Sequence, residues 1–383
     1  MFNIIILGIA SFFTDISSEM VYPLIPFFLT GLGASPAILG TIEGIAESVA
    51  SLLKVFSGYV SDRLGKRKAL TIAGYASSAL GKLVLVGATS WTAVLGARVV
   101  DRLGKGIRTA PRDALVADSA REGGHGVAFG IHRTLDTFGA VVGVALAYLS
   151  FRYVAGNYSA VFMWSLLPAT AGVLLLFLVR ERSAGPRRAG QPLVARWQAL
   201  PMRLRLFLGV ALVFTLGNSS NTFLLLRANS LGFTPAEAIL LYLVYNVTYA
   251  VLSYPAGRVS DLLGRRVVLV SGYAVYGAVY LAVAALGGSA RPWALWPLLA
   301  LYGVYSGLTD GVERALVADL APSSLRATAL GLHSTIVGLG LFPASFLAGQ
   351  MWTHVGPSAA FYFGGAIGIA AAVGLLVVLE PRA

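Results

Sequence analysis

Two carboxylates stand four residues apart in a stretch of the chain that is otherwise apolar. Asp15 and Glu19 lie in TDISSEMVYPLIPFFL, residues 14–29. A four-residue spacing puts both side chains on one face of a helix. In lipid such groups are rarely tolerated unless they face a protein interior or a water-filled path. We therefore expect this segment to do more than anchor the chain.

Three later segments carry further charged side chains at helical spacing. These are Glu43, Glu47 and Lys54 in the second apolar segment, Arg98, Asp101, Arg102, Lys105, Arg108 and Arg112 in the fourth, and His132, Arg133 and Asp136 in the fifth. Steps of mostly three or four residues place the members of each set on one helical face. Facing lipid, each charge would cost roughly 2.5–3.5 kcal/mol. We therefore predict that they line an aqueous cavity and pair with one another.

The composition is that of a membrane protein. Of 383 residues, 57% are hydrophobic and 12% are charged, and apolar runs near the roughly 20 residues that cross a bilayer recur along the whole chain. A soluble enzyme with buried parallel strands would have shorter apolar runs, separated by amphipathic helices. The absence of cysteine excludes disulfides, thiol chemistry and cysteine-ligated metals. The predicted fold class is therefore an all-α polytopic membrane protein.

Length and hydropathy predict twelve membrane spans. They are Asn3–Leu32, Ala37–Ser61, Ala69–Ala88, Trp91–Arg112, Val127–Phe151, Tyr158–Val179, Leu206–Ser230, Pro235–Ser260, Val267–Leu286, Trp293–Val317, Ala327–Trp352 and Ser358–Leu379. The polar segment between the sixth and seventh spans is rich in Gly, Pro and Arg, which is typical of a linker. We therefore divide the chain into an N-terminal six-helix lobe at 1–180, a cytoplasmic linker at 181–205 and a C-terminal six-helix lobe at 206–383.

The cations of the short loops predict the orientation. Arg63, Lys66 and Arg67 follow the second span and Arg265 and Arg266 follow the eighth, whereas the alternate turns carry almost no Lys or Arg. By the positive-inside rule, both termini are cytoplasmic. Much of the net charge of +12 then faces anionic headgroups, so it requires no nucleic acid. The first span lacks a basic leader and a cleavage site, and we expect it to be a retained helix.

Three short matches occur in the same positions in both halves. DALVADS at 113–119 recurs as RALVADL at 314–320, GIHRT at 130–134 as GLHST at 331–335, and GLGASPA at 31–37 as SLGFTPA at 230–236. The two halves therefore read as a parallel duplication of six spans. Such a repeat is typical of secondary transporters.

Two loops resemble the signature of a known family. GYVSDRLGKRK at 58–68 and GRVSDLLGRR at 257–266 are similar to the cytoplasmic loop motif of the major facilitator superfamily, at equivalent places in the two halves. With the span count, linker and repeat, the resemblance covers the whole chain and implies a bacterial secondary transporter. The glycine pattern in the fifth helix of drug antiporters is only partly present. Gly130, Gly139 and Gly143 fit it, but Val144 stands where that pattern has proline.

The resemblance also implies roles for particular residues. In this family the loop motif acts as a latch that holds one access state, with an acid at the start and cations behind it. The matching latch residues here are Asp62, Arg63, Arg67, Asp261 and Arg265. Asp62 is expected to accept bonds from a helix start, and the cations are expected to pair with carboxylates across the cytoplasmic interface. Spans one, four and five of each half line the central cavity in this family, and the charged faces lie on those spans.

The charged residues are compatible with more than one class of solute. Asp15 and Glu19 are negative, while Arg108, Arg112 and Arg133 are positive. The set fits a cation held by the acids, or an anion or zwitterion held by arginine, whose planar fork suits carboxylate and phosphate. Further cavity candidates are Glu43, Glu47, Arg98, Arg102, Asn218, Asn221, Tyr245 and Asn246. Much of the charge could instead be a mutually neutralised scaffold.

The remaining functional expectations concern energy and partners. The chain has no nucleotide-binding motif, no HExxH and no GxSxG, so an ion gradient is the expected energy source and an enzyme is not expected. Two carboxylates close together in a desolvated cavity should not both ionise, which favours protons as the coupling ion, with Asp15, Glu19, His132 and Asp136 as candidates. The family resemblance favours efflux by antiport. Uptake or exchange of an organic anion or zwitterion is the alternative, and a receptor or scaffold without transport is a minor one.

We expect a small-molecule substrate, protons or another coupling ion, and membrane lipids as partners. No cofactor, metal or nucleic acid is expected. The protein should be a monomer in the bacterial cytoplasmic membrane.

Overall fold

Helices make up every regular element of the chain that the structure describes. The computed structural model describes residues 1–64, 67–120, 125–181, 197–287, 292–322 and 325–379, and no strand occurs among them. Most of the predicted linker at 181–205 falls outside these ranges. The all-α prediction is confirmed.

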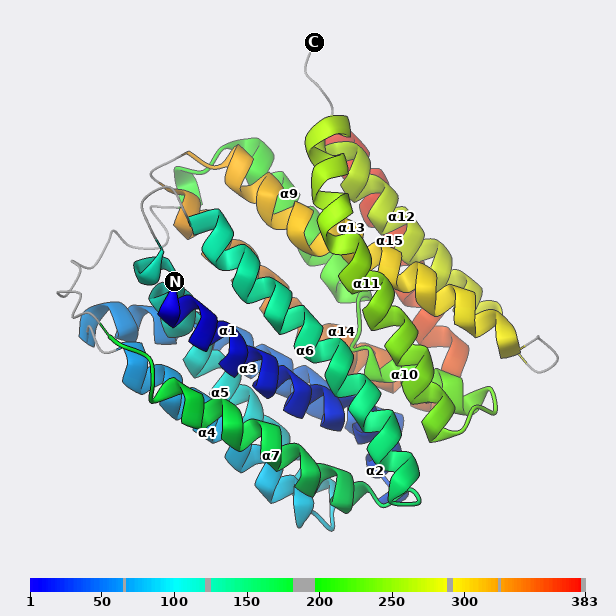
Figure 1. Ribbon diagram of the computed structural model, residues 1–383. Coiled ribbons are helices and arrows are strands. Elements are labelled where there is room, and N and C mark those ends of the chain that lie inside the picture. The colour runs from blue at the N-terminus through cyan, green and yellow to red at the C-terminus, as the bar shows by residue number, and fades with distance from the viewer. Residues whose placement is uncertain (65–66, 121–124, 182–196, 288–291, 323–324, 380–383) are drawn as a thin grey trace. The chain divides into compact units, whose positions relative to one another are not determined.

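The N-terminal half supplies six spanning elements (Figure 1). They are α1 (Phe2–Val21) with the 3₁₀ turn η1 (Tyr22–Leu24) and α2 (Ile25–Gly31), then α3 (Pro36–Leu64), α4 (Arg67–Val86), α5 (Trp91–Ser119), α6 (His125–Tyr153) and α7 (Tyr158–Leu176). Six more come from the C-terminal half. They are α9 (Met202–Gly217) with α10 (Thr222–Ser230), then α11 (Pro235–Leu263), α12 (Arg265–Ala285), α13 (Leu295–Leu320) after the 3₁₀ turn η2 (Pro292–Ala294), α14 (Arg326–His354) and α15 (Pro357–Val378).

Local sequence explains where several of these helices begin. The Ser90 side chain accepts a hydrogen bond from Ala93 N at the start of α5, and Asn157 does the same for Ala160 N at the start of α7. At α11, Thr234 and Glu237 form a capping box, and Pro235 occupies the first helical position. These contacts satisfy backbone N–H groups that have no partner within their own helix.

Not all of the twelve elements are equally apolar. In the described residues, nine helical segments are long and apolar enough to cross a membrane by length and composition. The three spanning elements outside this set are α3, α5 and α13. They carry carboxylates and cations, which hydropathy scales penalise.

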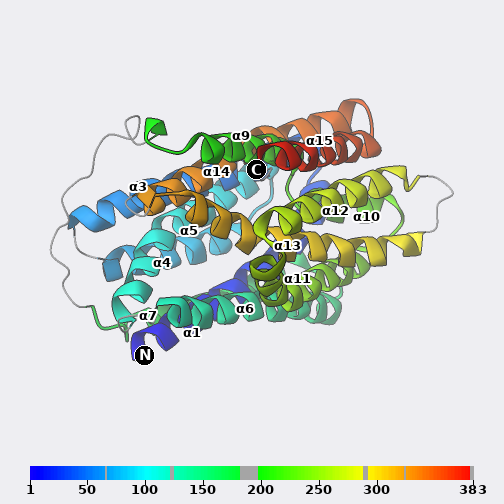
Figure 2. The same cartoon turned by 90° about the horizontal axis from the view of Figure 1, so that it is seen from above.

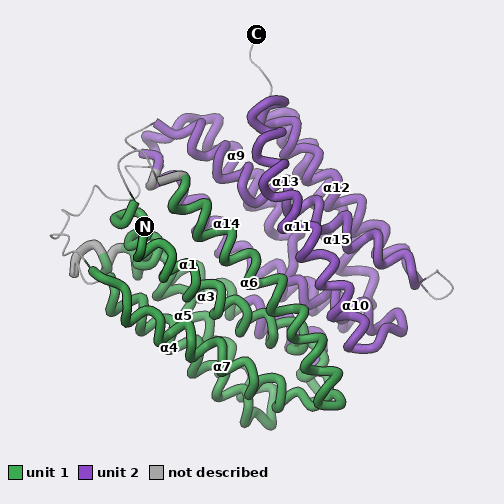
Figure 3. Tube along the Cα trace, in the orientation of Figure 1, with its two compact units in different colours: residues 1–34, 45–189 green, residues 35–44, 190–383 purple. Residues whose placement is uncertain are grey.

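The chain folds into two compact units (Figure 3). Unit 1 comprises residues 1–34 and 45–189, and unit 2 comprises residues 35–44 and 190–383. Residues 35–44 of unit 2 include the beginning of α3.

The same packing pattern occurs inside each unit. In unit 1, α1 packs against α6 and α7, and α4 packs against α5 and α7 (Figure 2). In unit 2, the equivalent helix α9 packs against α14 and α15, and α12 packs against α13 and α15. The two units are therefore pseudo-symmetric six-helix lobes, as the sequence repeat predicts.

Glycines allow the closest of these approaches. A Cβ atom on Gly139 of α6 would lie 2.5 Å from the carbonyl oxygen of Phe12 in α1, and one on Gly143 would lie 2.7 Å from that of Ile16. Gly139 and Gly143, four residues apart, thus form a small-residue face that lets α6 approach α1 closely.

The first and seventh spans are interrupted, whereas the sequence predicted continuous helices. In the first, the 3₁₀ turn Tyr22–Leu24 separates α1 from α2, and Pro23 and Pro26 remove backbone donors there. In the seventh, residues 218–221 separate α9 from α10, and Asn218 adopts φ −92° and ψ 79°, outside the helical region. Two asparagines, Asn218 and Asn221, flank this second break.

Candidate functional site

Asp101 of α5 is surrounded by three cations in the interior of unit 1. Its carboxylate lies 3.6 Å from Lys82 Nζ, 3.7 Å from Arg98 Nη1 and 3.7 Å from Arg102 Nη1. All four side chains are buried. Because a buried charge is tolerated only when it is paired, this cluster is mutually stabilising.

The cluster extends to two other helices. Arg102 Nη2 lies 2.8 Å from Glu47 Oε1 of α3, and Lys82 Nζ donates to Ser18 Oγ of α1 at 3.2 Å. Arg98 lies over the Tyr22 ring at 5.7 Å. A cavity of about 10 Å³ beside Lys82 and Asp101 has room for about one water molecule. The predicted residues Glu47, Arg98 and Arg102 are thus brought together in one ionic network.

A second network centres on Ser11 of α1. Its hydroxyl lies 2.8 Å from Tyr75 OH of α4 and 3.0 Å from His132 Nε2 of α6, and it accepts a hydrogen bond from Arg112 Nη1 at 3.1 Å. Arg112 also binds Asp113 Oδ1 at 2.9 Å. The serine hydroxyl therefore links helices α1, α4, α5 and α6.

The carboxyl groups of Asp15 on α1 and Asp136 on α6 lie next to each other. They are close enough to interact electrostatically. Asp136 also lies 3.8 Å from Arg112 Nη1 and 3.6 Å from Arg133 Nη1. Two carboxyl groups can form a hydrogen bond only when one of them carries a proton. This arrangement can therefore hold one proton between two helices.

The other predicted members of the first lobe lie close by. Glu19 packs against Gly143 of α6, and Gly143 lies two helical turns after Asp136 on the same helix. Arg108 donates to Ser78 Oγ, and its guanidinium lies 4.6 Å from the centre of the Tyr75 ring. Arg133 is half exposed. Glu43, in contrast, belongs to unit 2, where it is fully buried and accepts a hydrogen bond from Ser220 Oγ at 3.4 Å.

Unit 2 contains a cavity of about 300 Å³ beside the break between α9 and α10. Asn218 and Tyr245 line it, and Asn218 Nδ2 donates to Tyr305 OH at 3.0 Å. Asn221 Oδ1 accepts from Tyr302 OH at 2.8 Å. Asn246 is buried and donates to Tyr242 O of its own helix at 2.9 Å, so its contact is local.

Three of the predicted latch residues, Arg67, Asp261 and Arg265, form contacts within their own lobes. Arg67 pairs with Asp118 of α5, and its backbone N–H donates to Glu181 Oε1 at 2.5 Å. In unit 2, Arg265 lies 2.6 Å from Asp261 and 3.1 Å from Asp319. Asp118 and Asp319 occupy equivalent places in the two repeats, so the pairing recurs. The side chains of Asp62 and Arg63 lie outside the described part of the chain.

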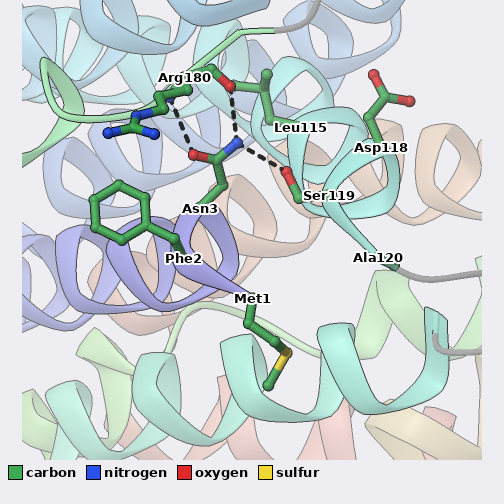
Figure 4. Close-up of a pocket in the computed structure, with 8 residues that line it drawn as sticks. All are labelled: Met1, Phe2, Asn3, Leu115, Asp118, Ser119, Ala120 and Arg180. Atoms are coloured by element: carbon green, nitrogen blue, oxygen red, sulfur yellow. Dashed lines mark hydrogen bonds between the residues drawn. The ribbon is translucent and has the colours of Figure 1, made fainter.

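A further hollow, of about 470 Å³, lies where α1 begins and α5 ends (Figure 4). The amide of Asn3 donates to Ser119 Oγ at 3.2 Å and to Arg180 O at 2.8 Å, and it accepts from Arg180 N at 3.0 Å. These bonds tie α1 to the ends of α5 and α7. The hollow includes none of the predicted site residues, and its contacts are those of a scaffold.

Sequence reasoning missed several members of these networks. Lys82 was detectable as a lone cation in the apolar span 69–88. Ser11 and Tyr75 carry no such signal, because serine and tyrosine are common in membrane helices. Among the described residues, no group of three or more His, Asp or Glu side chains is arranged to hold a metal ion.

Comparisons with known proteins agree with this architecture. The sequence matches the family model of the Major Facilitator Superfamily over residues 7–226 and 206–383. An uncharacterized MFS-type transporter of Methanocaldococcus jannaschii is 36% identical over 384 residues, which cover 98% of this chain and 94% of the relative. The multidrug resistance protein MdtH of Klebsiella pneumoniae is 25% identical over 380 residues, covering 95% and 90%.

Solved structures share the fold at low sequence identity. The nucleoside transporter NupG matches with a TM-score of 0.81 and 13% identity, covering 100% of both chains. The POT family transporter PepTSo matches with a TM-score of 0.80 and 14% identity, covering 99% of this chain and 97% of its own. The chain therefore belongs to the major facilitator superfamily of membrane transporters, which are not enzymes.

Proposed function

We propose that the protein exports a small charged or amphipathic solute across the cytoplasmic membrane by alternating access, in exchange for protons. Residues 1–180 and 206–383 are the two moving lobes, 181–205 is the linker, and both termini are cytoplasmic. The protein works as a monomer. Relatives named multidrug resistance protein MdtH support export as the direction.

The adjacent carboxyl groups of Asp15 and Asp136 carry this proposal. A proton shared between them leaves one negative charge, which Arg112 and Arg133 balance. Loss of that proton leaves two like charges side by side, a state that a cationic or polar solute stabilises. Proton and solute then favour different states of the same site, which is the requirement for exchange.

Glu19 and His132 complete the proposed coupling site. Glu19 packs against α6, the helix that carries Asp136. His132 contacts Ser11 of α1, which Arg112 also contacts. A change of protonation at Asp136 would therefore act on α1 through two routes, Asp15 and the Arg112–Ser11 bond.

Uptake or exchange of an organic anion or zwitterion is the second candidate. The observation that favours it is the excess of cations on α5, where Arg98, Arg102, Lys105, Arg108 and Arg112 outnumber Asp101, Asp113 and Asp118. Arginine's planar fork suits carboxylate and phosphate groups. A transport-inactive receptor would instead bind a ligand without moving it.

The test uses everted membrane vesicles in which respiration acidifies the interior. A solute that enters the vesicle in exchange for departing protons collapses the pH gradient, which a fluorescent amine reports. We expect Asp15→Asn and Glu19→Gln to abolish this response while solute counterflow without a gradient persists, and Asp136→Asn to act similarly or more mildly.

The matched control is Glu237→Gln, since Gln can keep the capping box while removing a carboxylate. If both first-helix variants keep full pH-dependent transport, the coupling proton binds elsewhere. If wild type exchanges organic anions and never moves protons, the second candidate replaces the first.

A further inference from the structure

We infer that the cavity of unit 2 binds an organic ammonium ion. The cavity has a volume of about 300 Å³ and lies within one lobe, between α9, α11, α13 and α14. This size is at the lower end of small-molecule sites. The inference rests on the proposed function, because it names the solute class that the transporter would carry.

Aromatic rings form much of the cavity wall. Phe214, Tyr245, Tyr249 and Tyr305 line it. The Tyr245 and Tyr249 rings are nearly parallel, with centroids 6.3 Å apart and an interplanar angle of 7°. The faces of such rings carry partial negative charge and attract cations, and quaternary ammonium groups are recognised in this way.

Two carboxylates supply the full negative charge. Asp310 and Glu313 of α13 both line the cavity. Asp310 accepts hydrogen bonds from Tyr249 OH at 2.7 Å and from Arg314 at 2.9 Å, while Glu313 accepts one from Tyr273 OH at 3.0 Å. The tyrosines thus orient the carboxylates without neutralising them.

Arg314 and His333 lie beside the two carboxylates. Arg314 is 56% exposed and does not line the cavity, so solvent screens its effect on Asp310. His333 Nε2 lies 3.3 Å from Glu313 Oε2 and is charged only when protonated. No Lys or Arg occurs among the described residues that line this cavity.

Comparison of the repeats shows that the charge has been inverted. The offset of 201 that relates His132 to His333 also relates Arg112 to Glu313 and Asp113 to Arg314. In unit 1, Arg112 and His132 both contact Ser11, which also contacts Tyr75, and in unit 2 Glu313 contacts His333 and Tyr273 directly. At this position the second lobe presents an anion where the first presents a cation.

Ring faces together with two carboxylates match a ligand that is both cationic and apolar. An inorganic cation would be held by oxygen atoms of the lining alone and would gain little from the ring faces. An organic anion would meet the two carboxylates and be repelled. The cavity therefore selects an ammonium group that carries apolar substituents.

The experiment measures binding to the purified full chain in detergent by isothermal titration calorimetry. The probe is benzyltrimethylammonium, and benzenesulfonate is the anionic comparison. We expect the ammonium probe to bind wild type, and Glu313→Gln and Asp310→Asn each to weaken it by about tenfold or more, as expected for loss of a close charge contact. Tyr249→Ala, which removes a ring face, should weaken it several-fold.

Glu237→Gln is again the matched control, since it removes a carboxylate from α11 without breaking the capping box, and it should bind like wild type. Should Glu313→Gln fail to fold, Asp310→Asn and Tyr249→Ala still decide the matter. The inference is overturned if the probe does not bind wild type, if none of the cavity variants weakens it, or if benzenesulfonate binds more tightly.

The result of this binding experiment can be distinguished from the result of the proton-coupling test. Binding in detergent requires no gradient, so Asp136→Asn should retain the ammonium probe even where it loses proton exchange. Loss of probe binding with intact proton exchange would refute only the proposed solute class and would leave the proton-coupling proposal standing.

Discussion

Asp101 offers the sharpest test of how this chain holds charge inside a membrane. Replacing it by asparagine keeps the shape but removes the anion that faces Lys82, Arg98 and Arg102. The three buried cations would then lose their common carboxylate, although Arg102 would keep its pair with Glu47. We expect Asp101→Asn to destabilise the protein strongly.

The expected size follows from the geometry. At separations of 3.6–3.7 Å, each pair attracts by roughly 4–5 kcal/mol at an effective dielectric constant of about 20. Desolvation offsets much of this, and removal of one partner from a buried pair costs about 3–5 kcal/mol. For a unit of this size, that lowers the thermal midpoint by roughly 6–20 °C.

The assay is intrinsic tryptophan fluorescence during heating of the purified protein, since the absence of cysteine rules out thiol dyes. Asp319→Asn is the control, because its carboxylate is 57% exposed and its pair with Arg265 is worth about 1 kcal/mol or less. Lys82→Met in the Asp101→Asn background should recover part of the loss. A midpoint for Asp101→Asn within about 2 °C of wild type, or an equal fall for Asp319→Asn, would show that burial of the Asp101 cluster does not determine its contribution to stability.

Two further predictions concern topology and gating. A cysteine introduced at Ser90 should react with an impermeant reagent in whole cells and one at Gly190 should not, because the cationic loops face the cytoplasm; the reverse labelling pattern would overturn the topology. Asp62→Asn should lower transport while solute affinity changes little, because it removes a charge that favours one closed state; equal loss of binding in the purified protein would make Asp62 a site or folding residue.

Much of the fold follows from the sequence for a simple reason. Each membrane helix must satisfy its own backbone hydrogen bonds, so span length and hydropathy report the elements directly. The predicted ends of α4, α12 and α15 lie within a few residues of the observed ones. The interruption at Tyr22–Leu24 carries a sequence signal in Pro23 and Pro26, which span length and hydropathy do not use. The interruption at 218–221 is uncharged, and helical spacing alone does not reveal a local change of dihedral angle.

The candidate site was harder to assemble from the sequence. Spacing placed Asp15 and Glu19 on one face and His132 and Asp136 on another, but it says nothing about which face meets which. The contact between Asp15 and Asp136 depends on the close approach of α1 and α6 at Gly139 and Gly143. The cavity of unit 2 draws on four helices, and tyrosines such as Tyr305 carry no sequence signal that distinguishes lining from packing.

The most direct test of the shared proton is an infrared spectrum of the purified protein in the carboxyl region at neutral pH. We expect a protonated carboxylic acid band in wild type that both Asp15→Asn and Asp136→Asn remove, because the remaining carboxylate then faces the arginines without a partner acid. Glu237→Gln should leave that band unchanged. If both aspartate variants keep the full intensity of the wild-type band, the Asp15–Asp136 pair does not hold the coupling proton, and proton exchange at this site is ruled out.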